Sequence, residues 1–185
     1  MVVSAKTYEQ VALEDSDRKW ELDHGCLRQK PGMTTEHNDA MRKLAIRLGA
    51  QLDEREFAVD MNATRLRIST SSFYIPDVTV IPRTLVRKAR DQLGGDRLEV
   101  YEEPLPLVVE VWSPSIGEYD VHVKLREYQR RGDAEIWLIH PYDQTLTAWR
   151  LQPDGSYSMT IYREGVVTPV ALPDVPIDVA TLFEA

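Results

Sequence analysis

A strand, a helix and a second strand follow one another closely over residues 106–140, and this succession limits the possible folds most. Residues 106–112 (PLVVEVW) and 135–140 (EIWLIH) are mostly apolar and rich in β-branched side chains, as is typical of strands buried on both faces. Between them, residues 120–131 are expected to form a helix that ends at Gly132. Short links of this kind predict a right-handed crossover between parallel strands. We therefore expect an α/β fold with a mixed sheet.

The other segments predict helices and antiparallel strands around this unit. The clearest helix covers about residues 36–53, where Met41, Leu44, Ala45, Leu48 and Leu52 recur at helical spacing. Further elements are expected as short helices near 8–15, 85–93 and 178–183, a hairpin over 20–28, strands at 57–61, 66–68 and 74–81, and a closing β meander over 145–162. The length of 185 residues fits one domain, 1–185.

Composition and motifs exclude several classes of protein. No run of about 18 apolar residues predicts a membrane span, and the first residues lack a secretory signal, so a cytoplasmic protein is expected. The one cysteine, Cys26, allows no disulfide within the chain. Glycine patterns typical of nucleotide binding are absent from the sequence, so no nucleotide cofactor is expected. The four histidines lack metal-ligand spacing, and surface or capping roles suffice for them.

The charge balance of 30 acidic and 22 basic residues would repel a polyanion unless the basic side chains were gathered on one face. Lys124, Arg126, Arg130 and Arg131 make the predicted helix at 120–131 basic, either as a phosphate-facing patch or as an ordinary solvated face. Carboxylates that bind a metal cation would also contribute to the negative net charge of the chain. The net charge of -8 therefore does not exclude nucleic acid.

Two predicted buried strands each carry one acid, Asp77 after Pro76 and Glu110 within 106–112. An ionised carboxylate is costly to bury, so each must be paired, lie at a strand end or bind a cation. If the strands are neighbours, the two acids can converge as hard oxygen ligands suited to Mg²⁺ or Mn²⁺. The alternative is that each is a strand-end acid bonded to loop amides.

Three polar residues share one face of the predicted helix at 120–131. Asp120, Lys124 and Tyr128 follow at i, i+4 and i+8, so they can point at the same cleft. A lysine there can orient a water molecule and stabilise charge on a phosphoryl group. The alternative is an ordinary exposed salt bridge between Asp120 and Lys124.

Taken in order, these motifs resemble the Uma-two family, a family of restriction endonucleases within the PD-(D/E)xK nuclease superfamily. The resemblance extends over nearly the whole chain and rests on the runs 74–77 (YIPD), 107–115 (LVVEVWSPS) and 135–139 (EIWLI), on Asp120, Lys124, Tyr128 and Gly132, on 21–25 (ELDHG), and on Glu36-His37 at a helix start. It implies a restriction-endonuclease-like core with flanking helices and a C-terminal β meander.

The resemblance also implies roles for individual residues. Asp77 and Glu110 would bind a divalent metal, and a lysine would assist hydrolysis of a phosphodiester. The superfamily places this lysine two residues after the strand glutamate, where this chain has Trp112, so Lys124 is expected to supply it from the helix. Glu36 is expected as a further metal ligand; its alternative role is a helix-start acid favoured by the helix dipole. Asp120 and Tyr128 are expected to hold Lys124 in place.

Two functions remain open at this point. The first is a Mg²⁺- or Mn²⁺-dependent endonuclease that hydrolyses DNA, with a homodimer expected by analogy with similar folds. The second is a non-catalytic module that binds nucleic acid or protein and retains the nuclease fold. The displaced lysine and the acidic composition favour the second, whereas the pair of buried carboxylates favours the first.

Overall fold

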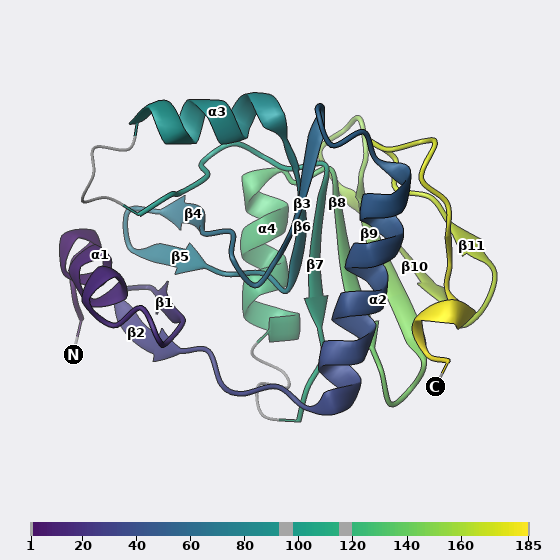
Figure 1. Ribbon diagram of the computed structural model, residues 1–185, viewed down its shortest axis with the longest axis horizontal. Coiled ribbons are helices and arrows are strands. Elements are labelled where there is room, and N and C mark those ends of the chain that lie inside the picture. Colours follow the sequence, from purple (N-terminus) through teal and green to yellow (C-terminus); the bar gives the residue numbers. More distant parts are fainter. Residues whose placement is uncertain (1, 93–97, 115–119, 185) are drawn as a thin grey trace.

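A computed structural model describes residues 2–92, 98–114 and 120–184 (Figure 1). Its helices are α1 (Ala5–Glu14), α2 (Thr35–Gln51), α3 (Arg83–Gln92) and α4 (Leu125–Arg131), with a π-helical turn η1 (Asp120–Lys124) and a 3-10 turn η2 (Ala180–Leu182). Its strands are β1 (Trp20–Asp23), β2 (Cys26–Gln29), β3 (Phe57–Met61), β4 (Leu66–Ser69), β5 (Ser72–Tyr74), β6 (Val78–Pro82), β7 (Leu107–Val111), β8 (Glu135–His140), β9 (Thr145–Leu151), β10 (Tyr157–Tyr162), β11 (Val166–Val167) and β12 (Ile177–Asp178).

A six-stranded sheet in the order β10-β9-β8-β7-β6-β3 forms the centre of the molecule. Strands β7 and β8 pair in parallel, with Val109 opposite Trp137, and the other neighbours in this sheet pair antiparallel. Helix α4 connects these two strands in the chain, as the apolar strands at 106–112 and 135–140 predict. The expected mixed sheet with flanking helices and a C-terminal meander, β8 to β10, is confirmed.

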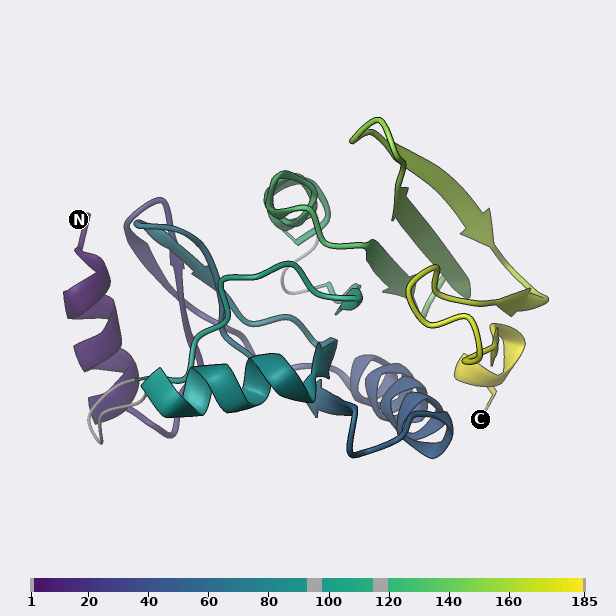
Figure 2. The same ribbon diagram turned by 90° about the horizontal axis from the view of Figure 1, so that it is seen from above.

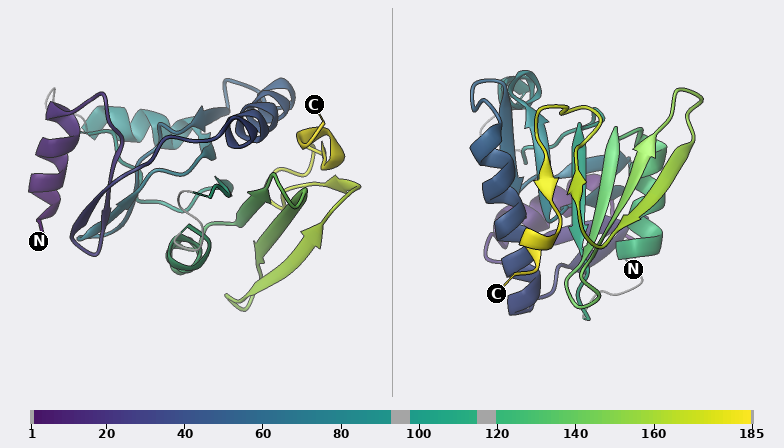
Figure 3. Two further views of the ribbon diagram at one scale, coloured as in Figure 1. Left: turned by 90° about the horizontal axis from the view of Figure 1, so that it is seen from below. Right: turned by 90° about the vertical axis from the view of Figure 1, so that its right-hand side faces the viewer.

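Helices cover both faces of this sheet (Figure 2). Helix α2 packs on one face through Leu44 and Leu48, beside the apolar side chains of β6 and β7 that share its core cluster. Helices α3 and α4 pack on the other face, where Tyr128 lies among Val108 and Ile136. The C-terminal segment with η2 lies beside α2 on the first face (Figure 3). Strands β6 and β7 are therefore buried on both faces.

A second, four-stranded sheet in the order β2-β1-β5-β4 lies to one side of the central sheet and is covered by α1 (Figure 1). Its hairpin of β1 and β2 turns at His24 and Gly25, both with positive φ. The Gly25 position has φ +82, and an added Cβ would lie 2.5 Å from Val2 Cγ1, so glycine suits the turn on both counts.

The structure corrects the single strand predicted at 74–81. The chain leaves β5 at Tyr74, passes through Ile75, Pro76 and Asp77, and begins β6 at Val78 in the other sheet. Pro76 has no N–H to give to a ladder, and the N–H of Ile75 bonds to a side chain instead. The segment 75–77 therefore crosses between the two sheets.

Two predicted helices also differ from the regular α-helices that were expected, although the first covers the predicted range 120–131. The predicted helix at 120–131 begins as the π-helical turn η1 and becomes α-helical only at Leu125. Near the C-terminus, the predicted helix at 178–183 is reduced to η2, because Ile177 and Asp178 pair with β11 as β12. In the described ranges, no helix has the length and apolar character needed to span a membrane.

Candidate active site

The two buried acids lie on neighbouring strands: Asp77 directly precedes β6, and Glu110 lies within β7. The pairing of β6 with β7 begins at Val78, opposite Val109, one residue after Asp77. The Asp77 N–H still donates to the Val109 carbonyl at 3.0 Å, although Asp77 precedes the strand. The two strands are neighbours, which is the condition under which these acids were expected to converge.

The Asp77 carboxylate is buried and accepts three hydrogen bonds. Lys30 Nζ donates to Oδ1 at 2.7 Å, while the Val111 N–H and His37 Nε2 donate to Oδ2 at 2.7 and 3.0 Å. Burial by itself would raise the pKa of Asp77, but Lys30 and His37 outweigh it and hold the pKa well below its usual range. Asp77 with Lys30, His37 and the Val111 amide is called the Asp77 cluster below.

Glu110 faces the opposite side of the sheet from α2 and meets side chains from η1 and α4. The Tyr128 hydroxyl donates to Glu110 Oε1 at 2.6 Å, and Lys124 Nζ lies 3.4 Å from the same oxygen. Lys124 Nζ also donates to Glu21 Oε1 at 2.8 Å and lies 5.8 Å from the centroid of the Tyr74 ring. Glu110, Lys124, Glu21 and Tyr128, all buried, are called the Glu110 cluster.

Ile75 joins the two clusters through its backbone. Its carbonyl accepts from Lys30 Nζ at 2.7 Å, and its N–H donates to Glu21 Oε1 at 2.7 Å. Ile75 lies between β5 and β6 and pairs with no neighbouring strand in the described part of the chain. Buried peptide groups need hydrogen-bond partners, and side chains supply them here. Two buried lysines and three buried carboxylates are therefore held around one crossing of the chain.

The structure brings most of the predicted residues together. Asp77 bonds to the N–H of Val111, the residue after Glu110, and Lys124 and Tyr128 both reach Glu110. Lys124 is buried, so the alternative of an exposed salt bridge on the helix surface is wrong. Tyr128 was expected to hold Lys124, but its hydroxyl donates to Glu110. The backbone of Asp120 lies in η1, and its side chain is outside the described part of the chain.

Glu36 lies at the surface at the start of α2, next to the N-cap Thr34. Its own backbone N–H and the Thr34 hydroxyl lower the pKa of Glu36, and the Tyr142 hydroxyl donates to Oε2 at 3.2 Å. Among the described contacts, Glu36 reaches neither Asp77 nor Glu110. These contacts are those of a helix-start acid, and the role of Glu36 at a metal stays a prediction.

Three residues of the site were missed by sequence reasoning: Lys30, Glu21 and His37. The surface or capping role assigned to His37 is wrong, because its side chain is 0% exposed and contacts Asp77. Its place one turn after the N-cap Thr34 allows it to point inward. Glu21 lies between the apolar residues Trp20 and Leu22 in β1, and an acid flanked in this way is a weaker form of the signal that singled out Asp77 and Glu110. Lys30 follows β2 in a connecting segment and carries no such signal.

Aromatic side chains occupy the ends of β7 and β8. Trp112 stands where the nuclease superfamily has its lysine, and its ring stacks on His140 with centroids 4.3 Å apart. Tyr142 meets the Trp112 ring edge-on at 5.7 Å. Trp112 therefore packs against neighbouring aromatic rings, and the lysine next to Glu110 comes from the helix.

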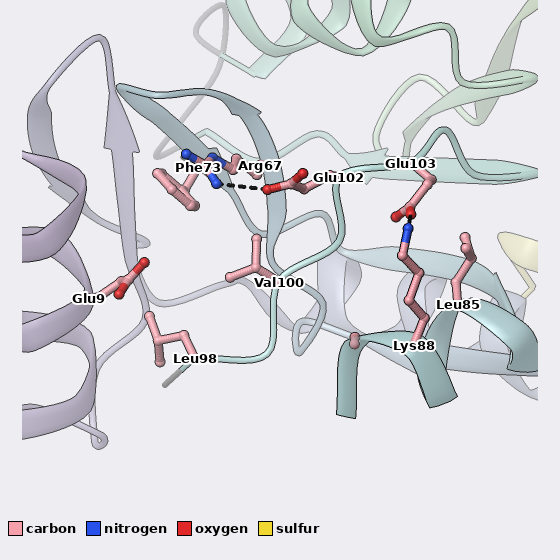
Figure 4. Close-up of a pocket in the computed structure, with 10 residues that line it drawn as sticks. Glu9, Arg67, Phe73, Leu85, Lys88, Leu98, Val100, Glu102 and Glu103 are labelled. Atoms are coloured by element: carbon pink, nitrogen blue, oxygen red, sulfur yellow. Dashed lines mark hydrogen bonds and ion pairs between the residues drawn. The ribbon is translucent and has the colours of Figure 1, made fainter. Parts of the chain in front are cut away.

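A separate cavity of about 160 Å³ lies between α1, α3 and the smaller sheet (Figure 4). Phe73, Leu98 and Val100 contribute apolar surface, and two ion pairs, Arg67 with Glu102 and Lys88 with Glu103, cross its rim. Its lining includes no member of either cluster, so the cavity is distinct from the candidate site.

The mixed sheet with flanking helices and the buried carboxylates on neighbouring strands agree with the restriction-endonuclease-like core that the resemblance implies, whereas the lysine from the helix departs from the superfamily pattern. The chain belongs to the Uma2 (Uma-two) family, described as "Putative restriction endonuclease", whose model matches residues 5–180. A search of curated proteins finds no match. Among solved structures, the chain is similar to a "putative nuclease belonging to DUF820" from Anabaena variabilis, with a TM-score of 0.73 and 16% identity over 90% of each chain. The expected family and fold are confirmed.

Proposed function

We propose that the protein is a divalent-metal-dependent endonuclease that hydrolyses phosphodiester bonds of DNA. The observation that carries the proposal is the burial of Asp77 and Glu110 on neighbouring strands, each with a lysine ammonium within 3.4 Å. Restriction-endonuclease-like proteins generally use divalent metals, so family membership supports the same chemistry. Asp77, Glu110 and Lys124 are the proposed catalytic residues.

The side chains present fit a hard divalent cation such as Mg²⁺ or Mn²⁺. Carboxylate oxygens are the preferred ligands, and Mg²⁺ is usually held by one or two carboxylates with water and substrate phosphate completing its shell. In the described ranges, no three His, Cys, Asp or Glu side chains gather as a metal cage. We propose that Asp77 and Glu110 would hold the ion, with Glu36 as the further ligand that the resemblance implies. When bound, the cation would offset phosphate charge and favour ionisation of a water.

The protein's own residues would position the reacting groups. Lys124, held between Glu21 and Glu110, would orient the attacking water and stabilise charge on the phosphate. Tyr128 fixes the Glu110 carboxylate through its hydroxyl, and His37 fixes that of Asp77. Groups held in this way need little reorganisation when the substrate binds.

We also propose that a single domain, 1–185, carries the activity and that it acts as a homodimer. Two copies would present two sites to the two strands of a duplex, and closed twofold symmetry is the commonest arrangement of oligomers. Light scattering of the purified protein measures the mass directly. A mass of one chain at assay concentrations would contradict the dimer and leave the single-site chemistry standing.

Calorimetric titration of Mn²⁺ into the protein tests the metal site without a guess about substrate. We expect binding to the unchanged protein and its loss in Asp77→Asn and Glu110→Gln. Labelled single- and double-stranded DNA, and RNA of the same sequence, should then be incubated with Mg²⁺, with Mn²⁺ and with chelator. Cleavage of DNA that requires metal supports the proposal, and equal products in chelator would contradict it.

Lys124→Met separates the lysine's role from that of the metal ligands, because methionine retains most of the length of the side chain but not the charge. We expect cleavage to be lost while Mn²⁺ binding remains. Circular dichroism and thermal unfolding of the variant confirm that it is folded. Cleavage at the unchanged rate would contradict the assigned role of Lys124.

A second candidate function is a non-catalytic module that binds nucleic acid or protein. The observation in its favour is that Asp77 and Glu110 are each already neutralised by a buried lysine. Such a module would bind nucleic acid or protein without cleavage, and Asp77→Asn would leave that binding unchanged. Absence of Mn²⁺ binding in calorimetry, together with intact DNA in every assay, would favour this function.

A further inference from the structure

We infer that Lys30 is an internal counter-ion that competes with a divalent cation for the Asp77 carboxylate. The inference rests on the proposed function, because it concerns the same metal site, and it adds a residue that controls how strongly the site binds metal. Lys30 comes from the segment after β2, far from Asp77 in the sequence. Its side chain is 3% exposed, so its charge must be balanced inside the protein.

The surroundings of the Lys30 ammonium are those of a bound cation. Nζ lies 2.7 Å from Asp77 Oδ1 and 2.7 Å from the Ile75 carbonyl oxygen. A carboxylate and a backbone carbonyl are also oxygen ligands of the kind that Mg²⁺ and Mn²⁺ accept. The ammonium therefore occupies the place that suits a metal ion.

A metal ion cannot bind Asp77 through its other carboxylate oxygen, Oδ2. Oδ2 already accepts from the Val111 N–H and from His37 Nε2. A carboxylate oxygen offers about two lone-pair positions, so both are taken. A metal that binds Asp77 must use Oδ1, where Lys30 is bonded. An ammonium and a divalent cation on one oxygen repel each other strongly inside a protein.

The main chain of Lys30 is anchored, whereas its side chain is free to change conformation. Its backbone N–H donates to the Lys19 carbonyl at 2.8 Å, which extends the β1–β2 hairpin and anchors the main chain. The side chain is a flexible four-carbon stem. We therefore expect the ammonium to leave Asp77 when metal binds. The cost of releasing it lowers the affinity of the site for metal.

The test compares Mn²⁺ affinity in the unchanged protein, Lys30→Met and Lys19→Met. Lys19 lies at the surface, and partial burial and the nearby charge of Lys30 lower its pKa. Lys19→Met thus removes the same charge from the same neighbourhood without exposing Asp77. We expect Lys30→Met to bind Mn²⁺ about tenfold more tightly or better, as removal of an adjacent unit charge implies, and Lys19→Met to change affinity far less.

Thermal unfolding supplies a readout independent of cleavage. In chelator, Lys30→Met should melt below the unchanged protein, because Asp77 loses a buried partner. Added Mn²⁺ should raise its melting temperature by more than that of the unchanged protein. Should Lys30→Met fail to fold in chelator, Lys30→Gln retains a donor to Asp77 without the charge and should show the same gain in affinity.

The outcomes separate this inference from the proposed function. If all three proteins bind Mn²⁺ equally, or Lys19→Met gains as much as Lys30→Met, Lys30 is not a competitor and the metal site stands. If only the Lys30 variants bind Mn²⁺, the inference is supported in its strongest form. If neither the unchanged protein nor the Lys30 variants bind, both the inference and the metal site are overturned.

Discussion

The Lys124 ammonium lies 2.8 Å from Oε1 of Glu21, a residue 103 positions earlier in the chain. Both side chains are almost fully buried, so water and salt screen this ion pair little. The contact fastens the β1–β2 hairpin to the helix that follows β7. It also restrains the lysine that we propose to orient the attacking water, which makes Glu21 a positioning residue.

Glu21→Gln should weaken both stability and cleavage. Glutamine retains an oxygen that can accept from the Ile75 N–H but removes the charge that holds Lys124. We expect a loss of about 1–3 kcal/mol in the free energy of unfolding, measured with urea. Cleavage should fall because Lys124 loses its closest partner. Glu21→Ala leaves Lys124 short of a buried partner and should cost more, about 3–5 kcal/mol. Urea midpoints equal to that of the unchanged protein would show that the pair is not important for stability.

Tyr128→Phe should lower cleavage more than it lowers stability. The substitution removes one short hydrogen bond to the Glu110 carboxylate and preserves the ring, which packs edge-on against Tyr74. A hydrogen bond to a charged group contributes about 1.5–3 kcal/mol, so the variant should remain folded. Cleavage rates and Mn²⁺ affinity measured together show whether Glu110 has lost its orientation. The matched control is Tyr74→Phe, which removes a hydroxyl bonded to Asp23 and should affect cleavage less.

Gly132→Ala should destabilise the protein by about 1–2 kcal/mol. Gly132 ends α4 in the left-handed region with φ 84, and an added Cβ would meet only Pro104 Cγ at 3.8 Å. The cost therefore comes from backbone conformation and not from crowding. Gly49→Ala is the opposite control, because Gly49 lies within α2 and an added Cβ finds nothing within 4 Å. It should stabilise the protein by about 1 kcal/mol. Urea unfolding of both variants checks the difference in sign.

Stability should fall as pH rises above about 10. Burial raises the pKa of Tyr8 from 10.0 to about 12, and its hydroxyl donates to the Trp20 carbonyl. The unfolded chain thus loses this proton near pH 10, while the folded protein retains it until about pH 12. Each pH unit in this window removes up to about 1.4 kcal/mol. Urea unfolding at increasing pH, with tyrosinate absorbance recorded, tests this. Tyr8→Phe should show a shallower decline, and an unchanged slope would contradict the assignment.

Local patterns in the sequence were sufficient for most of the fold. The helical spacing of apolar residues over 36–53 predicted α2, which runs over Thr35–Gln51. The succession of apolar strand, helix and apolar strand predicted the parallel pair β7 and β8. Both predictions were right because a helix buried on one face has apolar residues at helical spacing, and a strand buried on both faces is a short apolar run. The prediction of one continuous strand at 74–81 was wrong because the break in it depends on side chains from other parts of the chain.

The sequence by itself determined that Asp77 and Glu110 are acids in apolar surroundings, and that each must therefore have a partner. Only the tertiary structure decided which partner each has: Lys30 and His37 for Asp77, Lys124 and Tyr128 for Glu110. Lys30 and His37 reach Asp77 from 47 and 40 residues away. Spacing along a chain reports contacts within one element, whereas partners across elements are set by how sheets and helices pack. A charged residue in an apolar segment therefore predicts that a partner exists, and the tertiary fold determines which residue the partner is.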